Sequence, residues 1–114
     1  MSKKRKEELP IQYSRKAIFE IDKIWSWNEK TYDSIHDSSY VLFLLREAER
    51  QCRKKDAGQP VEGHPDWRHL FVRQSNKGHG YIVVFRKTAQ LIEILHFYHS
   101  AQDWPQRLKD ESTE

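Results

Sequence analysis

The sequence predicts an α+β domain in which a hairpin of two helices packs on one side of a small, mainly antiparallel sheet. Three observations predict it. The first half of the chain carries two stretches with apolar residues at helical spacing, and the second half carries three apolar runs joined by short polar links. The length of 114 residues allows one compact domain. The expected order is β-α-α-β-β-β, an arrangement that segregates helices to one face of the sheet.

Composition is polar, but it still provides a core. Lys and Arg number 20 against 17 Asp and Glu, a net charge of +3, and 32% of residues are charged. The 4 Trp, 5 Tyr and 5 Phe supply large side chains that a disordered chain lacks. We expect a single domain over residues 10–108, between a flexible basic tail at residues 1–9 and a polar tail at residues 109–114.

Several protein classes are excluded at this stage. Cys52 is the single cysteine, so an internal disulfide is impossible, and its place on an apolar helix face favours a small core residue over a nucleophile. The longest aliphatic run, residues 41–45, is far shorter than the roughly 20 residues of a membrane span, and the chain begins without the apolar stretch of a signal peptide. We expect a soluble cytoplasmic protein with no membrane partner.

The first strand and helix follow Pro10. Residues 11–13 alternate as in a strand, and Ser14 is placed to cap a helix. The helix then shows an apolar stripe at helical spacing, made of Ala17, Ile18, Ile21, Ile24 and Trp25. Phe19 and Trp27 lie outside this stripe. Either the helix is buried on two sides, or these two rings meet something other than the core of the domain.

A second helix follows a polar connection at residues 31–37. Ser38 or Ser39 caps it, and it runs to about Lys54. Its apolar face consists of Val41, Leu44, Leu45, Ala48 and Cys52. Two amphipathic helices joined by a short connection form an antiparallel hairpin on a common core.

The sheet comes from the second half of the chain. Glycines and prolines make residues 55–66 a loop, and strand-like runs follow at 70–73, 81–86 and 91–98. The turns at 75–78 and 87–90 are short, which favours antiparallel neighbours. Strict alternation in the last strand places His96 and Tyr98 on the face of Ile92 and Ile94, and His99 on the other. Residues 100–108 form a short helix or a wrapped arm.

This order, with specific residues, resembles the RelE/ParE superfamily of bacterial type II toxins over residues 11–108. The similar segments are Ser14-x-x-Ala17 with Glu20-Ile21-x-x-Ile24-Trp25, Pro60-x-x-Gly63 with the strand led by Arg68, the strand at residues 80–86, and the ending His99-x-x-x-Asp103. Two positions depart from the usual ParE-like pattern: Gln102 stands where Arg is common, and Phe85 where Tyr is common.

The resemblance implies one of two activities on one fold. RelE-like members are ribosome-dependent endonucleases that cut mRNA, whereas ParE-like members trap DNA gyrase on DNA. Cutting RNA requires a base, a proton donor and cations beside the phosphate. Arg68, Arg86 and His99 are the candidates for these catalytic roles. Residues 100–105 contain no Lys or Tyr, and Arg107 is the only cation close by, which favours the ParE-like activity.

We therefore predict a ParE-like toxin that arrests growth by poisoning gyrase through binding rather than catalysis. The alternatives are a RelE-like ribonuclease acting on the ribosome and mRNA, and a degenerate toxin that only binds its antitoxin. The resemblance also implies a cognate antitoxin, assembled with the toxin as a hetero-oligomer. The predicted partner-binding residues are Phe19, Trp27, Trp104 and Arg107. No cofactor is predicted, and no metal, because His96 and His99 point to opposite faces of their strand.

Overall fold

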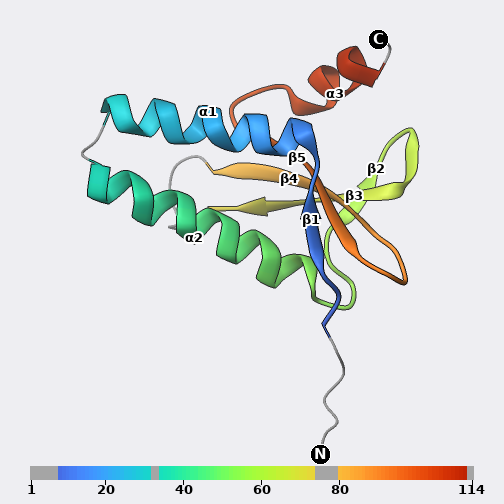
Figure 1. Ribbon diagram of the computed structural model, residues 1–114. Coiled ribbons are helices and arrows are strands. Elements are labelled where there is room, and N and C mark those ends of the chain that lie inside the picture. The colour runs from blue at the N-terminus through green and yellow to red at the C-terminus, as the bar shows by residue number, and fades with distance from the viewer. Residues whose placement is uncertain (1–7, 32–33, 74–79, 113–114) are drawn as a thin grey trace, which may run out of the picture.

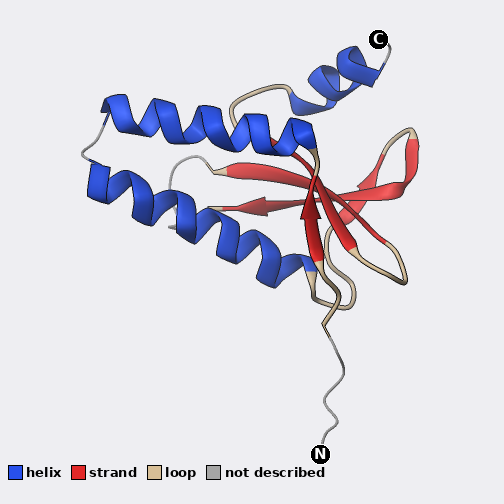
Figure 2. Ribbon diagram, in the orientation of Figure 1, coloured by secondary structure: helices blue, strands red, loops and turns tan. Residues whose placement is uncertain are grey.

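The computed structural model describes residues 8–31, 34–73 and 80–112, and it confirms the α+β class. Figure 2 shows the two long helices side by side, with the strands of one sheet against them. The elements are β1 (Ile11–Tyr13), α1 (Arg15–Thr31), α2 (Ser34–Cys52), β2 (Gln59–Val61), β3 (His64–Val72), β4 (Tyr81–Lys87), β5 (Ile92–His99) and α3 (Trp104–Ser112) (Figure 1). No helix within the described ranges is long and apolar enough to cross a membrane.

The sheet is mixed and has five strands in the order β1-β5-β4-β3-β2. β1 pairs in parallel with β5, and the other neighbours pair antiparallel. β1 covers β5 only as far as Ile94, so the rest of that edge is left for side chains of α1. Ser14 donates its hydroxyl to the carbonyl of Leu95 at 2.7 Å, and Glu20 accepts the amide of Phe97 at 2.8 Å. These bonds satisfy backbone groups that a longer β1 would otherwise pair.

Two segments that the sequence predicted as irregular connections contain helix or strand in the structure. The segment at residues 31–37 has no glycine or proline to stop a helix, and α2 begins already at Ser34. The predicted loop at 55–66 contains β2 and the first residues of β3. β2 accommodates Pro60 because it is an edge strand, where a missing N–H is tolerated. The predicted turn at residues 75–78 lies outside the described residues.

Each face of the sheet has its own core. The first core lies between the helical hairpin and the sheet, and it includes Ala17, Leu44, Cys52, Phe85 and Ile94. The second core lies on the opposite face, and its buried members are Val61, Val84, Leu95, Tyr98 and Leu108. Leu108 belongs to α3, so this helix covers the second face. α3 continues past Leu108 to Ser112, whereas the sequence predicted a polar tail from residue 109.

A register shift explains why one face assignment in β5 is wrong. Val84 pairs with His96, but the next residue, Phe85, pairs with Ile94, which leaves Leu95 as an extra residue in β5. A bulge of this kind reverses the alternation of the side chains that follow it. His96 and Tyr98 therefore lie on the second face under α3, and not with Ile92 and Ile94. His99, predicted on the face opposite Ile92, instead meets Tyr81 on the side of the first core.

Loss of the Ser14 hydroxyl is expected to destabilise the fold. Ser14 Oγ accepts the Ala17 amide at 3.0 Å, which confirms the predicted N-cap, and it also donates to β5. Replacing Ser14 with alanine removes both bonds, and we expect unfolding in urea to require about 1–2 kcal/mol less free energy. The exposed Ser26 in α1 supplies the matched control. Equal stability of Ser14→Ala and Ser26→Ala would contradict the capping role.

The thiol of Cys52 is expected to be unreactive in the folded protein. Cys52 is completely buried in the first core, which confirms its predicted role, and burial raises its pKa to about 12. The reactive thiolate is then a fraction on the order of 0.0001 of the thiol at pH 8. We expect alkylation at pH 8 to proceed only as fast as the protein unfolds, and to be complete within minutes in denaturing urea. Rapid labelling of the native protein would contradict this burial.

Candidate functional site

Arg68, the first candidate for RNA chemistry, is engaged in holding a loop. Its Nε donates to the carbonyl of Ala57 at 2.6 Å, and its Nη2 donates to the carbonyl of Gly58 at 2.7 Å. Both acceptors belong to the segment that leads from α2 into β2. The guanidinium therefore positions this loop against β3.

Arg86 and His99 lie far from each other in the sheet. Arg86 forms an ion pair with Glu93, its partner across β4 and β5. His99 pairs with Tyr81 at the opposite end of these strands, where the two rings meet edge to face at 5.3 Å. Five residue steps along β4 separate Tyr81 from Arg86, about 17 Å of strand. The structure does not bring Arg68, Arg86 and His99 together into one site.

The predicted partner residue Phe19 lies at an apolar groove on the outer side of α1. The groove has a volume of about 420 Å³, and it is lined by Arg15, Ile18, Phe19, Ile21, Asp22 and Trp25. The Phe19 ring is 58% exposed, and the ammonium of Lys23 lies 4.8 Å from its centroid. The side chain of Trp27, the other off-stripe aromatic residue, lies outside the part of the chain that is described.

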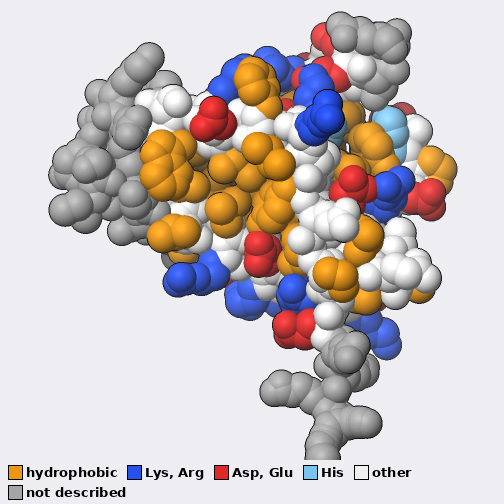
Figure 3. Space-filling view, in the orientation of Figure 1, with side chains coloured by type: hydrophobic (Ala, Val, Ile, Leu, Met, Phe, Trp, Pro, Cys, Tyr) orange, Lys and Arg blue, Asp and Glu red, His pale blue; other side chains and the backbone are white. Residues whose placement is uncertain are grey.

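Ile18 is a functional candidate that sequence reasoning missed. Its helical spacing assigned it to the buried stripe, yet it is 56% exposed, whereas Ala17 and Ile24 are buried. The apolar stripe is thus wider than the contact with the sheet and continues onto the surface. Leu42 on α2 is also 50% exposed, and Figure 3 shows hydrophobic side chains gathered over α1 and α2. Contiguous exposed apolar surface of this kind marks an interaction site.

Trp104 and Arg107, the other predicted partner residues, occupy different environments on α3. The half-buried Trp104 ring lies 4.6 Å from the ring of His69 and 6.5 Å from that of Tyr98, between centroids, so it closes the edge of the second core. Arg107 is exposed and lines a cleft of about 480 Å³ together with Glu20, Tyr98 and His99. Arg107 is therefore available to a partner, and Trp104 mainly supports the helix that carries it.

Ionisable groups beside this cleft are perturbed by burial. Burial raises the pKa of Tyr98 well above its usual value, and its hydrogen bond to Glu111, at 2.8 Å, acts in the same direction. Tyr98 is consequently a protonated hydrogen-bond donor at neutral pH. Burial also raises the pKa of Tyr81 to about 12. Away from the cleft lining, burial and the nearby charge of Arg68 lower the pKa of His69, which lies against Trp104.

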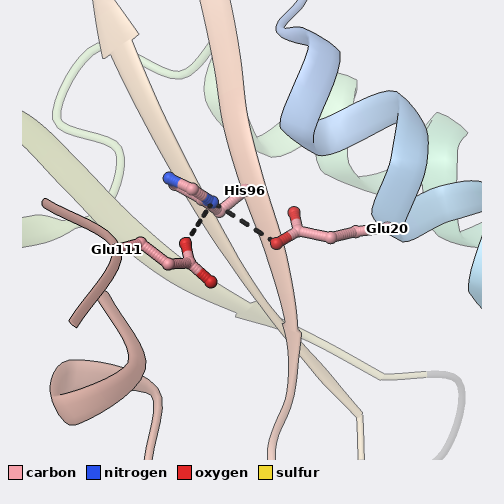
Figure 4. Close-up of side chains that lie close together, drawn as sticks. All are labelled: Glu20, His96 and Glu111. Atoms are coloured by element: carbon pink, nitrogen blue, oxygen red, sulfur yellow. Dashed lines mark hydrogen bonds and ion pairs between the residues drawn. The ribbon is translucent and has the colours of Figure 1, made fainter. Parts of the chain in front are cut away.

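Glu20, which lines the same cleft, also belongs to a cluster with His96 and Glu111. Both carboxylates approach the Nδ1 atom of His96, at 3.4 Å from Glu20 and 3.7 Å from Glu111 (Figure 4). The three residues come from α1, β5 and α3. Sequence reasoning missed this cluster because 76 residues separate Glu20 from His96, and no local spacing connects them.

Comparison with known proteins places the chain in a family. Residues 11–104 match the sequence profile described as ParE toxin of type II toxin-antitoxin system, parDE. A solved structure of the chromosomal ParDE TA system from P. aeruginosa is similar to this chain, with a TM-score of 0.62 and 16% sequence identity over 80% of this chain and 95% of that chain. No curated protein matches the sequence. The profile spans most of the chain and the fold agrees with it, so the chain belongs to the ParE toxin family of type II toxin–antitoxin systems.

Proposed function

We propose that this toxin arrests growth by binding DNA gyrase and that a cognate antitoxin holds it inactive. The placement of Arg68, Arg86 and His99 supports gyrase over RNA as the target. Arg86 and His99 lie at opposite ends of β4 and β5, and the guanidinium of Arg68 is committed to the carbonyls of Ala57 and Gly58. RNA cleavage would need them to converge on one phosphate. The proposed target places the protein in the cytoplasm.

The groove on α1 is the proposed antitoxin site. Its lining is mainly apolar, with Ile18, Ile21 and Trp25, and it carries one charge of each sign, Arg15 and Asp22. An amphipathic segment with apolar anchors fits these features. The net charge of +3 favours an acidic partner, because opposite charges speed the encounter while apolar contacts slow dissociation. The family match supports a partner of the antitoxin class.

The exposed side of α3 is the proposed gyrase contact. Arg107 projects at the cleft, and Trp104 anchors the first turn of its helix against His69 and Tyr98. The residues of this contact are separate from those that line the α1 groove. One surface can therefore be changed without changing the other.

Induction of the chain in bacterial cells tests the proposal. We expect growth arrest, cleaved chromosomal DNA and intact mRNA, and we expect co-expression of the cognate antitoxin to restore growth. Cleaved mRNA with intact DNA would favour the RelE-like alternative. Normal growth at a verified level of folded protein would favour a degenerate toxin.

A charge reversal on α3 separates the two surfaces. We expect Arg107→Glu to reduce growth inhibition about tenfold, measured as the inducer concentration required for arrest, because it reverses the charge at the proposed gyrase contact. Antitoxin binding should be unchanged. Arg46→Glu, an exposed charge on α2, is the matched control. Equal effects of the two substitutions, or full toxicity of Arg107→Glu, would contradict a gyrase contact on α3.

A further inference from the structure

We propose that Glu20, His96 and Glu111 form a binding site for one divalent transition-metal ion, and that Zn²⁺ is the ion it takes. One ligand atom from each residue lies within 4.8 Å of the other two. Figure 4 shows the carboxylates of Glu20 and Glu111 approaching the same ring nitrogen of His96 from two sides. Its three ligands are residues that neither the proposed gyrase contact, Trp104 and Arg107, nor the antitoxin groove contains.

The polar atoms of the cluster lie at distances that a shared ion could bridge as well as hydrogen bonds. Nδ1 lies 3.4 Å from an oxygen of Glu20 and 3.7 Å from an oxygen of Glu111, and both distances exceed the usual range of about 2.7–3.2 Å for N–H···O bonds. A single N–H also cannot point at two carboxylates at once. Tetrahedral Zn²⁺ with bonds of about 2.0–2.1 Å separates its ligand atoms by about 3.3 Å. The ligand atoms lie within 4.8 Å of one another, so the two carboxylates would have to move closer together around the ion to complete the geometry.

Charge favours a divalent cation in this place. His96 is only 7% exposed, and each carboxylate is mostly buried. Two carboxylates side by side at low exposure are unfavourable unless a cation lies between them. The cations that share the cleft with Glu20, Lys23 and Arg107, are themselves exposed to solvent. A divalent ion bound between the carboxylates offsets both charges.

Secondary contacts hold both carboxylates toward His96. The Tyr98 hydroxyl donates to the oxygen of Glu111 that faces His96, at 2.8 Å, and it lies 3.2 Å from Nδ1. The second oxygen of Glu20 accepts the amide of Phe97 at 2.8 Å. Contacts of this type orient the ligands of metal sites. Glu20 and Tyr98 also line the neighbouring cleft.

The ligand set selects the metal. One imidazole nitrogen with two carboxylate oxygens suits Zn²⁺, whereas Mg²⁺ and Ca²⁺ prefer oxygen ligands alone. Three protein ligands leave a fourth position for water. Because the ligands come from α1, β5 and α3, the ion would fasten the C-terminal helix over the second core. We therefore expect Zn²⁺ binding to stabilise the folded chain.

Calorimetry and thermal unfolding of the full chain, purified without a histidine tag and stripped of metal, test the proposal. We expect one Zn²⁺ per chain and a rise in Tm of about 5 °C or more at saturating ZnCl2, with no rise in MgCl2. Glu111→Gln and Glu20→Gln should each weaken Zn²⁺ binding about tenfold or more. Glu62→Gln, an exposed carboxylate between β2 and β3, is the matched control and should bind as the unaltered chain does.

Three results would overturn the site. One is no Zn²⁺-dependent rise in Tm, which would leave His96 as an ordinary partner of two carboxylates. Another is Zn²⁺ bound equally well by Glu111→Gln and Glu62→Gln. X-ray absorption of the Zn²⁺ complex of the unaltered chain gives a measure that does not depend on how the variants fold. It should report one imidazole ligand, and two or more would assign the ion to other histidines.

Discussion

Replacing Ile18 with glutamate is expected to weaken antitoxin binding at least about 30-fold, because a charge would be buried where the groove needs an apolar anchor. Ile18 lines the groove on α1 and is 56% exposed in the chain alone. The substitution therefore leaves the core intact, and Tm should change little. Titration calorimetry with the purified cognate antitoxin measures the effect. In cells, this variant should stay toxic when the antitoxin is present.

Phe71→Glu is the matched control for Ile18→Glu. Phe71 is an exposed apolar residue as well, at 40%, but it lies on β3 and does not line the groove. We expect its antitoxin affinity to equal that of the unaltered chain. Equal losses for the two variants, or full affinity of Ile18→Glu, would contradict a docking site on α1.

Replacing Phe85 with alanine is expected to lower the free energy of unfolding by about 3–5 kcal/mol, the largest stability effect of a single substitution proposed for this chain. Phe85 is fully buried in the first core, and its ring packs against the backbone of Gly58 in the loop that Arg68 holds. Domains of this size have a total stability of about 5–15 kcal/mol. We expect the urea midpoint to fall sharply, or the variant to be largely unfolded at 37 °C.

Phe71→Ala is the matched control for Phe85→Ala, because it removes the same side chain from an exposed position. We expect its free energy of unfolding to fall by less than about 1 kcal/mol. Circular dichroism during urea titration measures both variants. A loss for Phe85→Ala as small as that for Phe71→Ala would contradict the first core as described here.

Local signals in the sequence were sufficient for most of the fold. Alternation at residues 11–13 and the cap at Ser14 were correct, because neighbouring residues determine both. The spacing of Val41, Leu44 and Ala48 also identified the buried face of α2. β2 was missed because it is a three-residue edge strand that contains Pro60, and such a strand has no periodic pattern.

The bulge in β5 shows why the site was harder to predict than the fold. The extra residue, Leu95, depends on the pairing of β4 with β5 and leaves no mark in either strand alone. It moves His96 to the second face, where Glu20 and Glu111 meet it. Phe19 was identified because it breaks a helical pattern, whereas Ile18 obeys the pattern and is exposed only because the stripe extends past the sheet.

A supercoiling and DNA-cleavage assay with purified gyrase and the purified full chain tests the proposed function most directly. We predict loss of supercoiling and accumulation of cleaved DNA at micromolar chain, with both effects reversed by the antitoxin and weakened by Arg107→Glu. Unchanged gyrase activity, together with cutting of mRNA only when ribosomes are present, would contradict gyrase as the target.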